Sequence, residues 1–288
     1  MKTIITMHFV HSLWTKPLIV NRRNVEFKTS LLTTILCNAT SVAWVNHLGG
    51  KINLYVDGFG RDMLDFLPYD NIYELKVPLH IPTCTWACGK FLVLEKMPLG
   101  DVHIDGDVFL KSNKLLELCA DDSYDMVVQS IENDKTTLKK YYSNVRDILK
   151  KNNIKTHSCS LEESPSYNCG TIGFFNQELK QKYLVEYFTT LNNIINNKLC
   201  LLTLNKDLNA IPDLILEQQF LYELAKPYKV NNLLGDTESM YDNAIKLNYQ
   251  HILGGFKEQQ LNNIMNELKY VDENIYKDTM KHINFLIS

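Results

Sequence analysis

Short runs of apolar and β-branched residues alternate with helical segments over the first 110 residues of the chain. The strand-like runs cover residues 2–9, 52–56, 72–77 and 102–110. The helical segments between them cover residues 27–46, 64–67 and 86–97. Strands joined by helical crossovers pair in parallel and are covered by helices on their faces. The pattern therefore predicts an α/β fold, a Rossmann-like and mostly parallel sheet flanked by helices.

The remainder of the chain mixes polar segments with amphipathic helices. Strand character returns at residues 171–175 and 230–234, and helices are expected at 179–195 and 214–224. From residue 257 onward the pattern is helical to the end. We expect a single domain over residues 1–288 with a helical C-terminal part.

Composition excludes several classes of protein. The chain has 288 residues, 45% of them hydrophobic, which is enough for a sizeable core, and its net charge of −3 argues against a nucleic-acid partner. No apolar run approaches the roughly 18 residues of a membrane span, and the N-terminus does not have a signal-peptide pattern. The seven cysteines are scattered, so we expect reduced thiols and a cytoplasmic protein. The charged C-terminal helices leave peripheral contact with a membrane open.

The most informative stretch is the acidic end of the run 102–110. On a strand, His103, Asp105 and Asp107 would share one face, and Gly106 would let a ligand or a turn come close to the backbone. Two such carboxylates at the carboxyl end of a buried strand repel each other unless a cation lies between them or one is protonated. The alternative is a polar strand end whose aspartates cap the next helix.

Further motifs follow in an order that resembles a known family. They are Asp57-Gly58, Lys90, Asp105-Gly-Asp107, Asn168-Cys-Gly170, Glu217-Gln218-Gln219 and His251-Ile-Leu-Gly-Gly-Phe-Lys257. Together they resemble the GT-A-fold glycosyltransferases of the retaining family-8 type, which includes glycogenin and bacterial lipopolysaccharide galactosyltransferases. The last motif, His-x-x-Gly-x-x-Lys, is the most specific of the set.

The resemblance implies a metal-dependent glycosyltransferase that moves a sugar from a nucleotide-diphosphate donor to a carbohydrate or glycan acceptor with retention of configuration. It implies a Mn²⁺ or Mg²⁺ ion held by Asp105, Asp107 and His251. The implied contacts to the nucleotide diphosphate come from His8, Asp57, Lys90, Asp105, Gly254, Gly255 and Lys257. The residues that would border the sugar and the acceptor, and that form the expected catalytic set, are Asn168, Glu217 and Gln218. Residues 1–130 would form the nucleotide-binding half, 131–256 the acceptor half, and 257–288 the C-terminal helices.

The chain also departs from the family pattern. Glu258 and Gln259 stand where Pro-Trp is expected after the lysine. Thr6, His8 and His11 replace the acidic residues of the first strand, which leaves the base of the nucleotide open. Lysine at position 90 lacks the bidentate fork of the arginine found there in the family.

Each of these residues also has an ordinary structural interpretation. His251 could be a buried histidine with satisfied hydrogen bonds, and Lys257 a solvated residue near the start of a helix. Glu217 and Gln218 could lie on the exposed face of a helix, and Asn168 could serve in a turn.

Two other functions stay open at this point. One is a non-catalytic carbohydrate- or metal-binding protein on the same scaffold. The other is a sugar nucleotidyltransferase, which is disfavoured because those enzymes have a glycine-rich loop after the first strand and no glycine precedes Gly49 here. Acceptor specificity is expected in residues 132–165, where no motif stands out.

Overall fold

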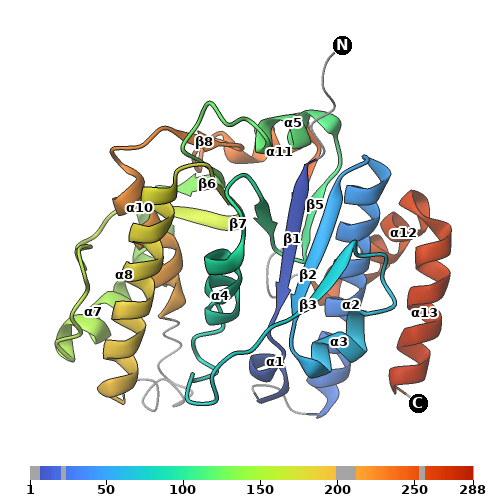
Figure 1. The fold of residues 1–288 in the computed structure, drawn as a ribbon, viewed down its shortest axis with the longest axis horizontal. Coiled ribbons are helices and arrows are strands. Elements are labelled where there is room, and N and C mark those ends of the chain that lie inside the picture. Colours follow the sequence, from blue (N-terminus) through green and yellow to red (C-terminus); the bar gives the residue numbers. More distant parts are fainter. Residues whose placement is uncertain (1–6, 21–23, 199–211, 253–256, 288) are drawn as a thin grey trace. The chain divides into compact units, whose positions relative to one another are not determined.

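The computed structural model describes residues 7–20, 24–198, 212–252 and 257–287. It has an α/β fold in which helices flank mostly parallel strands (Figure 1). The chain divides into two interleaved units. The first comprises Met1–Lys76, Asp101–Ala120 and Ala244–Ser288, and the second comprises Val77–Gly100 and Asp121–Asn243. These units do not follow the linear halves expected at residues 1–130 and 131–256.

The first unit contains four parallel strands in the order β3-β2-β1-β4. Their bounds are β1 (His8–Leu13), β2 (Lys51–Val56), β3 (Asn71–Glu74) and β4 (Val102–Ile104). A separate antiparallel pair consists of β5 (Val108–Leu110) and β9 (Tyr249–His251). The helices are α1 (Lys16–Val20), α2 (Asn24–His47), α3 (Gly58–Leu64), α5 (Asn113–Cys119), η3 (Glu258–Gln260), α12 (Leu261–Val271) and α13 (Glu273–Ile287).

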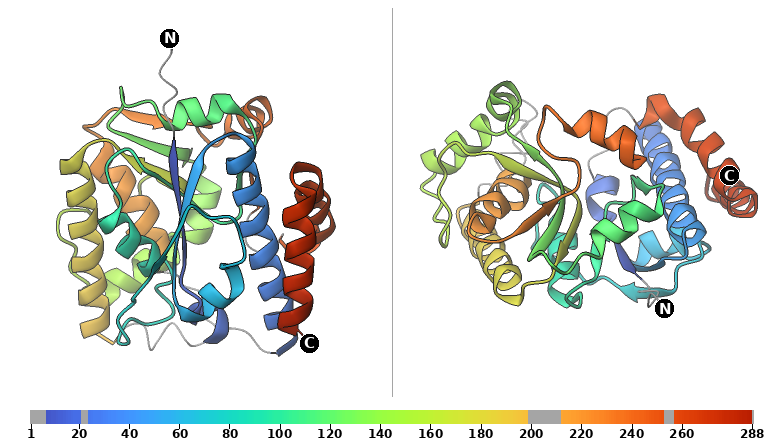
Figure 2. Two further views of the ribbon diagram at one scale, coloured as in Figure 1. Left: turned by 45° about the vertical axis from the view of Figure 1, so that its right-hand side comes forward. Right: turned by 90° about the horizontal axis from the view of Figure 1, so that it is seen from above.

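Helix α2 is the centre of this unit. Its buried residues face in several directions, as expected for a helix that is covered all round. Helices α12 and α13 lie along α2 on the side away from strand β2 (Figure 2). Leu36 and Ala43 of α2, Leu54 of β2 and Leu268 of α12 share one buried apolar cluster. This packing fixes the helix that lies beside the acidic segment following β4.

The second unit contains strands β7 (Ser166–Phe174), β6 (Met126–Glu132) and β8 (Val230–Asn232), in that order. Strand β6 is antiparallel to β7 and parallel to β8. Its helices are α4 (Cys88–Lys96), α6 (Lys135–Tyr141), α7 (Ser143–Lys151), α8 (Gln177–Asn196), the π-helix η1 (Leu214–Gln219) and α10 (Phe220–Ala225). Helix α11 (Met240–Leu247) spans the boundary between the two units.

The prediction of an α/β fold with a mostly parallel, helix-flanked sheet is confirmed. Several boundaries differ from those expected. The first strand is His8–Leu13 rather than residues 2–9, and strands β6 and β9 were not predicted. Within the described parts of the chain, no helix combines the length and the apolar character needed to cross a membrane.

Candidate metal centre

The acidic segment forms a turn between two strands. Strand β4 ends at Ile104 and β5 begins at Val108. The backbone N–H of Val108 donates to the carbonyl oxygen of Asp105 at 2.9 Å, which closes a turn over residues 105–108. The expectation that His103, Asp105 and Asp107 share one face of a continuous strand is therefore wrong, because strand alternation stops at Ile104.

Glycine suits position 106 because the side chain of Asn38 on helix α2 comes very close to this turn. A Cβ atom placed on Gly106 would fall 2.7 Å from Cγ of Asn38, nearer than side chains normally approach. The amide of Asn38 is itself held by a 2.8 Å hydrogen bond from Nδ2 to the carbonyl oxygen of Thr34. The glycine between the two aspartates thus lets the turn rest against the side chain of Asn38.

Pairing of β5 with β9 brings His251 to the same place. Val108 stands opposite His251 in the antiparallel register, and the N–H of Ile252 donates to the carbonyl oxygen of Asp107 at 3.0 Å. As a result, Nε2 of His251 lies 3.5 Å from Oδ1 of Asp107. The backbone pairing of β5 with β9 therefore determines the distance between His251 and Asp107.

Asp105, Asp107 and His251 offer three donor atoms that all lie within 4.8 Å of one another. Donor atoms bound to a single divalent ion at about 2.1 Å lie about 3 to 4.2 Å apart, a spacing that small side-chain rotations would reach from here. Two carboxylates with one imidazole form a donor set typical of Mn²⁺ and related divalent ions. The residues therefore fit a divalent cation.

Lys257 lies against the same carboxylate. Its ammonium group forms an ion pair with Oδ2 of Asp107, the oxygen not facing His251. Burial by itself raises the pKa of Asp107, but the charges and hydrogen bonds of Lys257 and His251 outweigh it, so the pKa lies well below its usual value. Burial likewise lowers the pKa of Lys257, and Asp107 more than reverses this. Asp107 is therefore ionised and ready to act as a ligand.

A chain of hydrogen bonds supports the turn from behind. Ser41 of α2 donates its hydroxyl to the carbonyl oxygen of Val108 at 2.7 Å, so its own oxygen must accept from Nε2 of His11 at 3.0 Å. Nδ1 of His11 then accepts from the hydroxyl of Tyr69 at 2.9 Å. Burial lowers the pKa of His11 to about 3, although Asp107 acts in the opposite direction. His11 is thus a neutral imidazole that fixes Ser41 and, through it, Val108.

His103 stands behind the other carboxylate. Its Nδ1 lies 3.8 Å from Oδ1 of Asp105, and its Nε2 is 2.8 Å from the hydroxyl of Ser12 on β1. The ring is buried, whereas the carboxylate of Asp105 is partly exposed. His103 therefore lies beside Asp105 at more than hydrogen-bond distance.

The remaining predicted residues of the first unit are more scattered. Asp57 follows β2 and caps α3, accepting from the N–H of Gly60 at 2.9 Å and of Thr15 at 2.8 Å. His8 begins β1 opposite Lys51, at the amino ends of the strands, whereas Asp105 follows the carboxyl end of β4. The structure therefore does not bring His8 to the acidic turn. Gly254 and Gly255 lie outside the described residues.

Lys90 and Glu217 contact each other in the second unit. Nζ of Lys90 lies 2.7 Å from Oε1 of Glu217 and 3.1 Å from the carbonyl oxygen of Cys169, and the two side chains are only 5% and 1% exposed. Asp213, one helical turn before Glu217, is also buried. Burial and the charge of Glu217 raise the pKa of Asp213 well above its usual value. The hydrogen bond that the N–H of Ala87 donates to Asp213 acts in the opposite direction. The Lys90 amine is thus engaged inside this unit.

Gln218 and Asn168 belong to a second network in this unit. The hydroxyl of Tyr142 contacts both Oε1 of Gln218 and, at 2.8 Å, a carboxylate oxygen of Glu132. Nδ2 of Asn168 donates to the other oxygen of Glu132 at 3.2 Å. Glu132 therefore links the two predicted residues through Tyr142. Gln218 is half-buried, unlike its neighbour Glu217.

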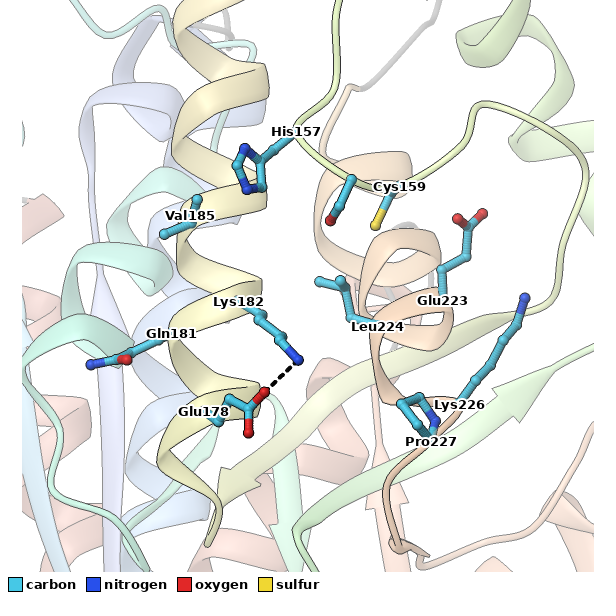
Figure 3. Close-up of a pocket in the computed structure, with 11 residues that line it drawn as sticks. His157, Cys159, Glu178, Gln181, Lys182, Val185, Glu223, Leu224, Lys226 and Pro227 are labelled. Carbon is cyan, nitrogen blue, oxygen red and sulfur yellow. Dashed lines mark ion pairs between the residues drawn. The ribbon is translucent and has the colours of Figure 1, made fainter.

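The second unit also contains a hollow of about 590 Å³ between α8, α10 and the loop 157–159 (Figure 3). Glu186 holds the loop by accepting from the N–H groups of His157 at 2.8 Å and of Cys159 at 3.0 Å. Glu178 and Lys182, two charged residues that line the hollow, form an ion pair of 2.6 Å. None of the individually predicted site residues lines this hollow, but its loop 157–159 belongs to residues 132–165, where acceptor specificity is expected.

Comparison with known proteins gives one match. Residues 7–286 match the family model described as "Family of unknown function (DUF6734)". The chain belongs to the DUF6734 family. No curated protein and no solved structure matches it significantly.

Sequence reasoning missed the supporting residues of this DUF6734 chain. Asn38 and Ser41 contact the acidic turn from outside the motifs, and Tyr69 supports Ser41 through His11. The sequence analysis treats His11 only as a replacement for an acidic residue. A signal existed for one of them, because Gly106 already indicated a close approach to the backbone. Only the packing of α2 shows that Asn38 makes this approach.

Proposed function

We propose that this chain is a metal-dependent glycosyltransferase that uses a nucleotide-diphosphate sugar. The observation that carries the proposal is the convergence of Asp105, Asp107 and His251, whose donor atoms lie within 4.8 Å of one another. The family resemblance assigns these three residues to one metal, although His251 lies far from the two aspartates in the sequence. The pairing of β5 with β9 adds an imidazole to the two carboxylates, and this mixed donor set supports a metal site more strongly than acidic groups alone.

When bound, a divalent ion would neutralise the charge that develops on the departing diphosphate. Asp105, Asp107 and His251 would hold it, and the imidazole favours Mn²⁺ over Mg²⁺. Lys257, which is in contact with Asp107, would add a positive charge to the diphosphate. Capture of the anionic donor has to be local, because the net charge of −3 gives no long-range attraction.

The proposal assigns the diphosphate to Lys257 and not to Lys90. The amine of Lys90 is buried against Glu217, so reaching a phosphate would leave that carboxylate without its counter-charge. By family resemblance, Gln218 and Asn168 border the sugar and a glycan acceptor. Of the residues in this motif, half-buried Gln218 is better placed than Glu217 to meet a ligand.

A cytoplasmic location is part of the proposal. The cysteines that the structure describes are all free thiols, which suits a reducing compartment. Nucleotide sugars and divalent ions are both available there to such an enzyme.

A donor screen tests the proposal. The protein is incubated with Mn²⁺ and a panel of nucleotide-diphosphate sugars, and release of nucleoside diphosphate is measured. We expect release from at least one donor and its loss in Asp107→Asn. Asp278→Asn, at an exposed position of α13, is the matched control. NMR of the product anomer then tests retention, and an inverted linkage would contradict it.

One observation favours a second candidate, a binding protein without catalysis. Lys90 and Glu217, two predicted site residues, form an ion pair with each other in the interior of their unit. If the wild-type protein binds Mn²⁺ and a carbohydrate but releases no nucleotide from any donor in the panel, this second function replaces the first.

A further inference from the structure

Asp107 has a different neighbour at each of its two carboxylate oxygens. Oδ1 faces Nε2 of His251 at 3.5 Å, and Oδ2 is in contact with the ammonium group of Lys257. The carboxylate of Asp107 is only 11% exposed, while the lysine side chain is 32% exposed. The aspartate is thus fixed in place, and the lysine has solvent on one side.

A divalent ion and the Lys257 ammonium would repel each other if both used this carboxylate. A carboxylate-bound metal lies about 2.1 Å from its oxygen, and an ammonium about 2.8 Å, so the two cations would be roughly 5 Å apart. In a site of reduced dielectric constant, two charges of +2 and +1 at this separation repel by several times the thermal energy. Simultaneous occupation is therefore unfavourable.

We propose that Lys257 and the divalent ion alternate on Asp107, so that binding of the metal releases the lysine ammonium toward the diphosphate. This inference rests on the proposed function and adds a regulation to the same site. Lys257 neutralises the buried carboxylate before the metal arrives, and the metal takes over that task. The protein therefore gains a mobile positive charge only when the site is loaded.

The test is the affinity for Mn²⁺ alone, measured by loss of the free-ion signal in electron paramagnetic resonance. We expect Lys257→Met to bind Mn²⁺ about tenfold more tightly than wild type, because the competing charge is gone. Lys257→Arg keeps the charge and should bind with an affinity close to wild type. Lys277→Met removes a charge from an exposed pair with Glu273 on α13 and should change nothing.

Thermal unfolding supplies an independent measurement that does not depend on activity. With EDTA, Lys257→Met should have a lower Tm than wild type, since Asp107 has lost its counter-charge. Added Mn²⁺ should raise the Tm of this variant by more than it raises that of wild type.

The outcomes separate the two proposals. Equal or weaker Mn²⁺ binding by Lys257→Met, with normal binding by wild type, would overturn the alternation and leave the metal site standing. Absence of Mn²⁺ binding in every variant, wild type included, would overturn both the alternation and the proposed function.

Discussion

Nε2 of His251 lies 3.5 Å from Oδ1 of Asp107, and the ladder between β5 and β9 holds the two residues together. Val108 pairs with His251, so the histidine follows the position of the acidic turn directly. The candidate site therefore depends on backbone geometry at residues 105–108.

Replacing Gly106 by alanine should damage the turn. The added Cβ would meet Asn38, which is tied to Thr34 within its helix. We expect Gly106→Ala to destabilise the protein by about 1–3 kcal/mol, measured by urea unfolding, and to weaken Mn²⁺ binding. Gly58→Ala is the control, because a Cβ there meets no heavy atom within 4 Å. Adding Asn38→Ala to Gly106→Ala should recover part of the loss, and a purely additive double mutant would argue against the contact.

His11 predicts a specific dependence of stability on pH. Burial lowers its pKa to about 3 in the folded state, against about 6.5 in the unfolded chain. Between these values the unfolded state binds more protons, so the stability contributed by neutral His11 is present above pH 6.5 and is lost as the pH falls. The free energy of unfolding should decrease by about 1.4 kcal/mol per pH unit over that window because of this residue.

The substitution His11→Gln isolates the effect. Its side-chain amide can still donate to Ser41 but cannot take up a proton. Unfolding curves from pH 7 to pH 4 should therefore converge for the two proteins as the pH falls, because the wild type alone carries this dependence. Parallel curves would show that His11 is not held neutral by burial.

The Lys90–Glu217 pair should be structural. Removing one partner leaves a buried charge without compensation, and Lys90→Met should destabilise the protein by about 3–5 kcal/mol. The double variant Lys90→Met with Glu217→Leu should regain most of that loss, because an apolar pair needs no counter-charge. A loss below about 1 kcal/mol in the single variant would mean that Glu217 is already protonated or solvated.

Much of the fold could be predicted because hydrophobic periodicity reflects burial. The helix expected at 27–46 is α2, Asn24–His47, and the strand at 52–56 is β2, Lys51–Val56. The run 102–110 misled because its apolar residues are buried in two separate strands, and periodicity does not reveal that Gly106 breaks the ladder. Strand β9 has only three residues, too few for a pattern to emerge.

The candidate metal ligands were predictable for a different reason. Asp105 and Asp107 stand out as acidic residues after an apolar run, and His251 stands out only through its spacing to Lys257. The contact of Lys257 with Asp107 could not be foreseen, since it depends on how β9 returns to β5. The contact between Lys90 and Glu217 likewise depends on how α4 and η1 pack, which the sequence does not show.

The most direct test of the central claim is the Mn²⁺ affinity of four proteins measured by electron paramagnetic resonance: wild type, Asp107→Asn, His251→Ala and the control Asp278→Asn. We expect one Mn²⁺ per chain in wild type and in the control, with affinity weakened by roughly 100-fold or more in each of the other two. Wild-type affinity in Asp107→Asn and His251→Ala, or no binding by the wild-type protein, would contradict the central claim.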